Sequence, residues 1–209
     1  MLRARSEKAK DDRRQILLNA ALDEFHERGF TAARMEDIAK RAGFSKGTLY
    51  LYYSSKRDLF QALVEMITQP KIQNIEKIME MAPSALMAIQ TFTQFAPTVI
   101  RNSDLPRLMK ILVGASTSHP EIMVAYRKNV VERGLGAFAS MLARAKERGE
   151  ITIGDPKLTA RLLVAPMVMS ALWQTIFGAD PEAEIDLDTL FRLHGEILIR
   201  ALKIEGNDT

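Results

Sequence analysis

Two pairs of side chains between positions 46 and 52 have the chemistry to bind nucleic acid. Lys46 and Tyr50 are four residues apart, and so are Thr48 and Tyr52. If this segment is helical, each pair shares one face of the helix. A lysine ammonium donates to phosphates or guanine edges, tyrosine hydroxyls reach phosphates, and Gly47 lets a backbone approach closely. The pattern predicts a surface for double-stranded DNA.

A further basic residue follows at Lys56. Ser55 and Asp58 have the spacing of a capping box, which predicts that a helix begins here and that Asp58 reaches back to the Ser55 amide. The first turn of a helix carries free amides and a positive dipole end, and both attract a phosphate. We therefore expect Lys56 to contact a DNA phosphate.

The elements that must position these residues form a helix-turn-helix. A first helix begins near Asp12 and stops at Gly29, a second runs from Met35 to Ala42, and Gly43 allows a turn. Ser45 offers an N-cap for a third helix that ends near Tyr52. In this layout the second helix of the motif enters the major groove of DNA. Apolar positions suited to holding the two helices together are Ile38, Ala39, Ala42, Phe44, Leu49 and Tyr53.

The whole chain is predicted to be all-α. Apolar residues recur at spacings of three and four, and no sustained alternating run appears. Further helices are expected over residues 84–101, 104–117, 120–148, 156–177 and 186–203, and the segment between Pro70 and Pro83 is expected to connect two domains. We expect a DNA-binding domain over residues 10–58 and a second domain over residues 59–209.

The last two long helices carry wide apolar stripes. A helix that is apolar around most of its circumference must be covered on both sides, and in a chain of 209 residues a second copy covers the outer side most easily. We therefore expect a homodimer built on four helices, two from each subunit. The alternative is a monomer with an unusually well-filled core. Candidate interface residues are Leu162, Met169, Leu190, His194 and Ile197.

Composition and charge fit a cytoplasmic protein without a membrane partner. The chain has 209 residues, no cysteine and a net charge of +3. Residues 1–60 hold 13 Lys and Arg against 9 Asp and Glu, so the basic excess lies where DNA contact is predicted. The charged N-terminus does not read as a signal peptide. The longest apolar run, at 12 residues, is shorter than the ~20 residues of a membrane-spanning helix.

Residues 12–63 resemble the N-terminal domain of the tetracycline-repressor (TetR/AcrR) family. The likeness is carried by Gly29-Phe30, by the run from Ile38 to Tyr53, and by Lys56 and Leu59-Phe60. A weaker resemblance to a C-terminal type of that family lies in His119-Pro120-Glu121, Arg148-Gly149-Glu150, Asp155-Pro156 and Ala160-Arg161-Leu162. The resemblance implies an all-helical homodimer on a near-palindromic operator, with C-terminal helices around an effector pocket and the final two helices forming the dimer. By position, the family's usual DNA contacts fall on Arg34, Met35, Ser45, Lys46, Gly47, Thr48, Tyr50, Tyr52 and Lys56.

This sequence departs from the family pattern where the second helix begins. Ala33 stands where a hydroxyl residue often caps that helix, and Arg34 where threonine is frequent. Loss of a cap costs about 1 kcal/mol, although Arg34 has the charge to contact a phosphate or the minor groove. An operator preference cannot be carried over from any relative.

The expected effector is a small apolar molecule that releases a repressor from its operator. Most candidate pocket residues are apolar, and adaptable methionine and aromatic side chains suit a hydrophobic ligand. Plain core packing is the alternative reading of each residue. The candidates, from helices that surround the effector in the family, are Phe92, Phe95, Met109, Leu112, Ser116, Tyr126, Val130, Met167 and Trp173.

Two other functions are alternatives to a DNA-binding regulator. Gly43 to Gly47 satisfies G-x-S-x-G, the hydrolase nucleophile motif, but that motif needs a preceding strand, whereas a helix is predicted here. His26, His119 and His194 belong to no catalytic or metal-binding spacing, so neither an enzyme, a metal nor a cofactor is expected. A helical protein-interaction module stays open, although a groove for a partner helix favours apolar residues where Lys46 and Tyr50 stand.

Overall fold

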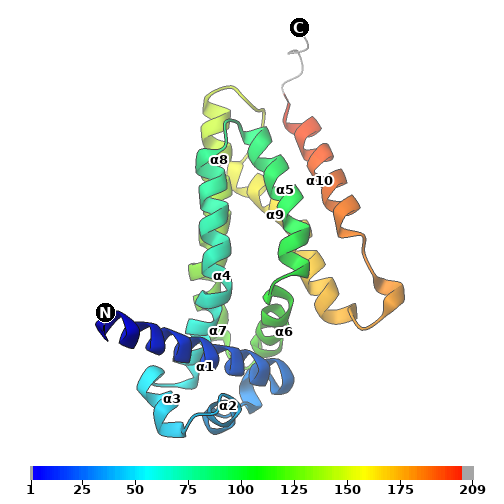
Figure 1. Ribbon diagram of the computed structural model, residues 1–209. Coiled ribbons are helices and arrows are strands. Elements are labelled where there is room, and N and C mark those ends of the chain that lie inside the picture. The colour runs from blue at the N-terminus through cyan, green and yellow to red at the C-terminus, as the bar shows by residue number, and fades with distance from the viewer. Residues whose placement is uncertain (1, 204–209) are drawn as a thin grey trace. The chain divides into compact units, whose positions relative to one another are not determined.

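The computed structural model (Figure 1) describes the backbone of residues 2–203 and the side chains from residue 7 onward. No strand occurs among these residues, which confirms the all-α prediction. The helices are α1 (Leu2–Ala32), α2 (Met35–Arg41), α3 (Lys46–Tyr52), α4 (Lys56–Met81), α5 (Ala85–Arg101), α6 (Leu105–Ala115), α7 (Pro120–Tyr126), α8 (Glu132–Glu147), α9 (Pro156–Phe177) and α10 (Leu187–Leu202).

The chain divides into two compact units. The N-terminal unit comprises Met1–Ile67 and Arg107–Val124, and the C-terminal unit comprises Thr68–Pro106 and Ala125–Thr209. The N-terminal unit therefore includes a segment that follows α5 in the sequence. Arg107 holds this segment to Asp23 of α1 through an ion pair of 2.5 Å, and the His119 ring meets the edge of Phe30 with centroids 4.8 Å apart.

The core of the N-terminal unit is built by α1, α2, α3 and the start of α4. Phe25, Phe30 and Phe60 form a triangle with ring centroids 5.2 to 5.5 Å apart, in the tilted and edge-on arrangements that aromatic rings prefer. Ile38 and Leu49 are fully buried beside them. The inward face predicted for the helix-turn-helix is confirmed at Ile38, Ala39, Leu49 and Tyr53.

Local signals explain the short helices. Gly43 has a φ of +74°, so the chain can turn sharply after α2 in a region that disfavours other residues. The Thr48 amide donates to the Ser45 side chain at 3.1 Å, which confirms the N-cap of α3. At the start of α4 the Asp58 amide donates to Ser55 Oγ, but the Asp58 carboxylate accepts from the amide and hydroxyl of Ser54 instead of the Ser55 amide.

Three helices differ from the sequence prediction. α1 begins at Leu2, ten residues before the predicted start. α4 runs without a break from Lys56 to Met81 through Pro70, where a kink or a new helix was expected. The predicted helix over residues 120–148 contains a π-helical turn at Arg127–Val131 between α7 and α8. Such turns insert one residue without ending a helix, so periodicity alone does not reveal them.

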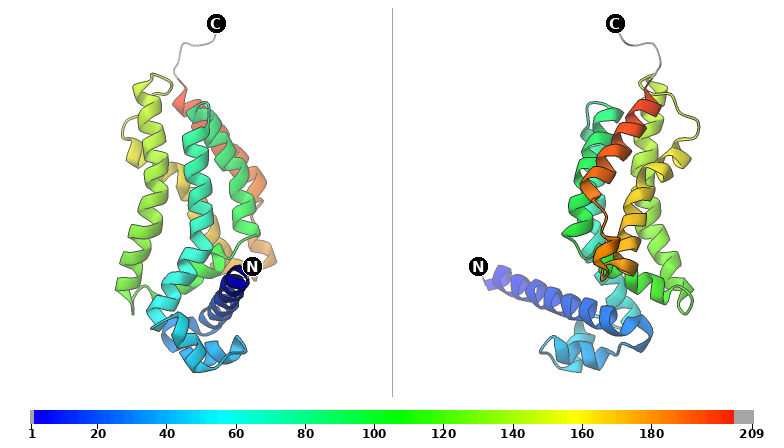
Figure 2. Two further views of the ribbon diagram at one scale, coloured as in Figure 1. Left: turned by 60° about the vertical axis from the view of Figure 1, so that its left-hand side comes forward. Right: turned by 90° about the vertical axis from the view of Figure 1, so that its right-hand side faces the viewer.

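The C-terminal unit packs α5, α8, α9 and α10 around a second core. Phe92 of α5 meets Phe138 of α8 edge-on at 4.8 Å, and Leu142, Ala160 and Leu163 are buried around them. α10 lies alongside α5 (Figure 2). A Cβ atom on Gly195 of α10 would lie 2.7 Å from Thr93 Oγ1 of α5, so only glycine permits this close approach.

Candidate nucleic-acid interface

The structure brings most of the predicted DNA-binding residues together on the outer side of α3. Leu49 is fully buried, whereas Lys46, Gly47 and Tyr50 are exposed and Thr48 and Tyr52 are half-exposed. A Cβ atom on Gly47 would meet only Ser45 Oγ, at 3.8 Å, so the backbone lies open there. The outer face of α3 therefore offers the basic, hydroxyl and backbone groups that contact DNA.

Ser45 is engaged within the protein. Its hydroxyl accepts from the Thr48 amide and lies 2.9 Å from Thr48 Oγ1. The same contacts bear on the hydrolase alternative, because Gly43 follows helix α2 instead of a strand and Ser45 acts as a helix cap.

Lys46 forms an exposed ion pair with Glu36 of α2. The contact raises the pKa of the Lys46 ammonium and lowers the pKa of the Glu36 carboxyl, chiefly through the hydrogen bond between them. The ammonium also lies 5.8 Å from the centre of the Tyr50 ring, within reach of a cation–π contact. A phosphate or a base edge must compete with Glu36 for this ammonium.

Arg34 and Met35 occupy different environments at the start of α2. Arg34, and not Ala33 as predicted, is the N-cap residue of α2; it is exposed, has extended backbone angles and makes no side-chain cap. Met35 is 6% exposed and packs into the core of the N-terminal unit. The Met35 side chain is therefore not available for DNA contact. Only its backbone amide, in the first turn of α2, could contact a phosphate.

Lys56 is held by the end of α1. Its ammonium donates to the carbonyl oxygens of Phe30 at 2.8 Å, Thr31 at 3.0 Å and Ala33 at 3.0 Å, and lies 4.8 Å from the centre of the Phe30 ring. An ammonium has three N–H donors, and these three carbonyls use them all. Burial lowers the pKa of Lys56. Lys56 is therefore engaged within the protein, where it binds carbonyl groups at the end of α1, and its contact with a DNA phosphate stays a prediction.

An ion-pair network fixes α2 against α1. Arg41 at the end of α2 donates to Glu24 at 3.1 Å and to Glu27 at 2.5 Å, and Glu24 also pairs with Arg28 at 3.0 Å. The Glu24 side chain is only 3% exposed, and a buried charge needs partners. The guanidinium groups of Arg28 and Arg41 compensate it. Hydrogen bonding to Arg41 lowers the pKa of Glu27. Sequence reasoning missed this network, because its partners are 14 and 17 residues apart.

The residues predicted to surround an effector lie in three environments. Phe92 and Met167 belong to the core of the C-terminal unit, and Phe95 is 43% exposed on α5. Tyr126 and Val130 are half-buried near the π-helical turn, and burial raises the pKa of Tyr126. The remaining residues of the α6 region, Met109, Leu112 and Ser116, belong to the N-terminal unit.

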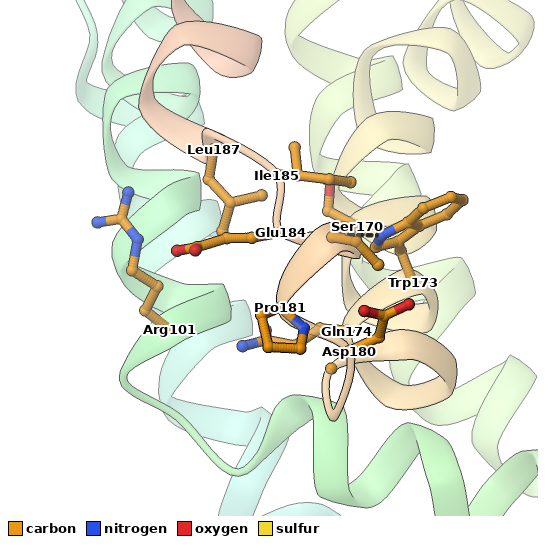
Figure 3. A pocket seen from close by; sticks show the side chains of 11 residues that line it. Arg101, Ser170, Trp173, Gln174, Asp180, Pro181, Glu184, Ile185 and Leu187 are labelled. Carbon is orange, nitrogen blue, oxygen red and sulfur yellow. Dashed lines mark hydrogen bonds between the residues drawn. The ribbon is translucent and has the colours of Figure 1, made fainter.

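A pocket of about 290 Å³ adjoins Trp173, the only one of those nine residues among its lining (Figure 3). Trp173 and Asp180 lie on one side of it, and Arg101 of α5 lies on the other. The Trp173 indole N–H donates to the Ala183 carbonyl at 2.7 Å. Ser170, Glu184 and Gln174 add polar groups, so this pocket is more polar than the apolar site expected from the sequence. A second pocket, of about 330 Å³, lies between α5 and α10 around Gly195.

The outward side of α9 is strongly apolar. Leu158, Leu162, Met169 and Ile176 are 61 to 66% exposed, and Ile197 of α10 is 64% exposed. By length and composition alone α9 could cross a membrane, although a core helix of a soluble protein passes the same test. The two other candidate interface residues are used within the subunit. His194 Nε2 donates to the Leu163 carbonyl at 3.0 Å, and Leu190 packs against a small core around Phe191.

Comparisons with known proteins assign the family. Residues 17–63 match the model of bacterial regulatory proteins of the tetR family, and residues 90–190 match the tetracyclin repressor-like C-terminal domain. The chain is 25% identical over 147 residues to the transcriptional regulator YezE of Bacillus subtilis, covering 69% of this chain and 76% of YezE. It is 29% identical over 156 residues to the transcriptional regulator RutR of Escherichia coli K12, covering 72% and 69%.

Solved structures share the fold. A putative TetR-family regulator from Mesorhizobium loti superposes with a TM-score of 0.75 at 22% identity, covering 93% of this chain and 98% of that one. The regulator FadR from Bacillus subtilis, solved with stearoyl-CoA, gives 0.73 at 20% identity, covering 90% and 98%. With two matching family models, regulators as relatives and an outward basic face on α3, the chain belongs to the TetR family and is a DNA-binding transcriptional regulator.

Proposed function

We propose that the protein is a homodimeric repressor that binds a palindromic operator and leaves it when a small apolar effector binds. The observation that carries this proposal is the exposed apolar stripe on α9 and α10. Two identical subunits related by a twofold axis present two copies of α3, and a palindrome is the DNA sequence that matches this symmetry.

The stripe has the spacing of one continuous helix face. Leu158, Leu162, Met169 and Ile176 follow one another at intervals of four and seven residues, and Leu193 and Ile197 of α10 are four apart. Burying one such side chain contributes about 1.5–3 kcal/mol. A second copy of the chain buries the whole stripe twice, which gives the dimer a large driving force.

The effector proposal has weaker and separate support. The pocket of Figure 3 and the apolar residues Phe92, Phe95 and Met167 lie in the C-terminal unit. FadR from Bacillus subtilis was solved with stearoyl-CoA, and SmeT, with a TM-score of 0.68 at 24% identity over 92% of this chain, is the repressor of a multidrug efflux pump. SmeT supports repression, and the acyl chain of stearoyl-CoA supports an effector with an apolar part.

Operator selection from randomised duplex DNA with the purified full-length chain tests the proposal. We expect an inverted repeat, a sedimentation mass twice the 23.5 kDa of one chain, and release of the operator by apolar compounds that change Trp173 fluorescence. Operator DNA must in turn weaken effector binding by the same factor.

Three outcomes contradict separate parts of the proposal. A selected site without inverted symmetry, or a monomer bound to it with full affinity, contradicts the dimer. A compound that saturates the C-terminal unit and leaves operator affinity unchanged contradicts its role as the effector. A reporter gene behind the selected operator that loses expression when the protein is removed indicates activation instead of repression.

A further inference from the structure

Leu51 is the most exposed large apolar residue of α3. It is 85% exposed, compared with 43% for Tyr50 one residue earlier. An α-helix turns by about 100° per residue, so Leu51 lies about 200° around the axis from the fully buried Leu49. Leu51 therefore projects almost straight away from the protein core. Gly47, one turn earlier on the same outer side, has no side chain to cover it.

We propose that Leu51 contacts the methyl group of a thymine in each half of the operator and so determines specificity at that base pair. The proposal rests on the DNA-binding function assigned above. The second helix of a helix-turn-helix lies in the major groove. Because α3 has only seven residues, we take the line opposite its buried face, which Gly47 and Leu51 share, to reach the base edges along the whole helix. Leucine neither donates nor accepts hydrogen bonds, and the thymine C5 methyl is the apolar group that the major groove displays.

The neighbours of Leu51 support this assignment. Lys46 is paired with Glu36 and lies over the Tyr50 ring, so its ammonium must exchange a partner before it reaches a base. Leu51 needs no such exchange. The apolar stripe assigned to dimer formation lies on α9 and α10 of the C-terminal unit, so that interface does not account for an exposed leucine on α3.

The test replaces each thymine of the selected operator in turn by deoxyuridine, which pairs identically and lacks only the methyl group. With the full-length protein we expect an affinity loss of about three- to tenfold at one symmetry-related pair of positions and little change elsewhere. Leu51→Ala is expected to lose a similar factor on the unmodified operator. At the sensitive positions it is expected to show no further loss with deoxyuridine, because the contact is already gone.

Controls separate this contact from general effects. Ile16→Ala removes an exposed apolar side chain from α1 (45% exposed) and should leave the deoxyuridine profile unchanged, while Leu51→Met should restore much of the sensitivity. The proposal is overturned if no thymine position is sensitive, or if Leu51→Ala keeps the full deoxyuridine penalty. Failure of the wild-type protein to select any operator instead removes the DNA-binding premise itself, and the two failures are told apart by the wild-type titration alone.

Discussion

The N-terminal unit buries most of its large apolar residues, whereas the α9–α10 surface exposes several of them. In the N-terminal unit Phe25 and Leu49 are fully buried, and Leu51 is the one aliphatic side chain that α3 exposes. On the outer side of α9, Leu162 and Met169 are 66% and 62% exposed. One region completes its core within a single chain, while the other leaves apolar surface that the proposed dimer covers.

This difference shows how α3 and α9 can serve different functions, DNA contact and the proposed dimer contact. α3 is held from behind by its own core, so its outer side is free to vary with the DNA that it contacts. In the proposed dimer the outer side of α9 must match another copy of itself, because a twofold interface is self-complementary. Substitutions on α3 should therefore change affinity for DNA, whereas substitutions on α9 and α10 should change the assembly.

The largest effect is expected from a charge on the α10 part of the stripe. Ile197→Glu places a carboxylate in the proposed interface, at a cost of about 3–5 kcal/mol for each of the two copies. Sedimentation should then show a chain of 23.5 kDa, with operator affinity falling in parallel. Met87→Glu, at an apolar residue of α5 that is 51% exposed, is the matched control and should leave the dimer intact. A dimer that survives Ile197→Glu places the interface elsewhere.

Next in size is a cavity in the core of the N-terminal unit. Phe25→Ala removes a ring that contacts Phe30 and Phe60, and is expected to lower the free energy of unfolding by about 3–5 kcal/mol. Urea denaturation measures the loss. Ile16→Ala, on the exposed side of the same helix, should cost well under 1 kcal/mol. Equal losses for the two variants would mean that the unit does not complete its own core.

A smaller effect is expected on the outer face of α3. Lys46→Ala should weaken operator binding by about 1–3 kcal/mol without changing the dimer. Glu36→Gln should strengthen operator binding, because it frees the Lys46 ammonium from its ion pair. It should reduce the salt dependence of binding less than Lys46→Ala does. Titrations at several salt concentrations measure both. Lys128→Ala, at an exposed lysine of the π-helical turn, controls for net charge, and Glu36→Gln with unchanged affinity would show that the ion pair does not compete with DNA.

The smallest effect concerns the cap of α3. Ser45→Ala removes the acceptor of the Thr48 amide and should cost about 1 kcal/mol of unfolding free energy. Thermal unfolding in the absence of DNA detects it. Ser140→Ala, at an exposed serine inside α8, has no cap to lose and should be neutral. If both changes are neutral, the position of α3 is set by its buried face alone.

Local signals in the sequence predicted most of the fold. The helix over residues 156–177 has the predicted bounds, because Asp155 caps its start and accepts from the Lys157 and Leu158 amides. The helix through Pro70 was not predicted, because proline has no amide donor and usually kinks or ends a helix. The early start of α1 also lacks a local signal.

The candidate site was predictable where its geometry is local. The shared face of Lys46 and Tyr50 follows from their spacing in one helix. The contact of Lys56 with the end of α1 was not predicted. Its carbonyl partners lie 23 to 26 residues earlier, and no local sequence signal points to them. Met35 was predicted as a DNA contact from the family pattern alone, and its side chain is buried. Leu51 was not among the predicted contacts, because leucine carries no hydrogen-bonding group.

The contact between Lys56 and the end of α1 also bears on which fragments of the chain are stable. The last carbonyl groups of a helix need partners from outside it, and here the ammonium of Lys56 serves two of them, on Phe30 and Thr31, together with the carbonyl of Ala33 just beyond the helix. A nascent chain that ends before Lys56 contains the complete sequence of α1, α2 and α3 but not this partner. Closing that loop is an entropic cost that helix formation alone does not repay. We therefore expect a fragment that ends before Lys56 to be less stable than one that also contains the start of α4.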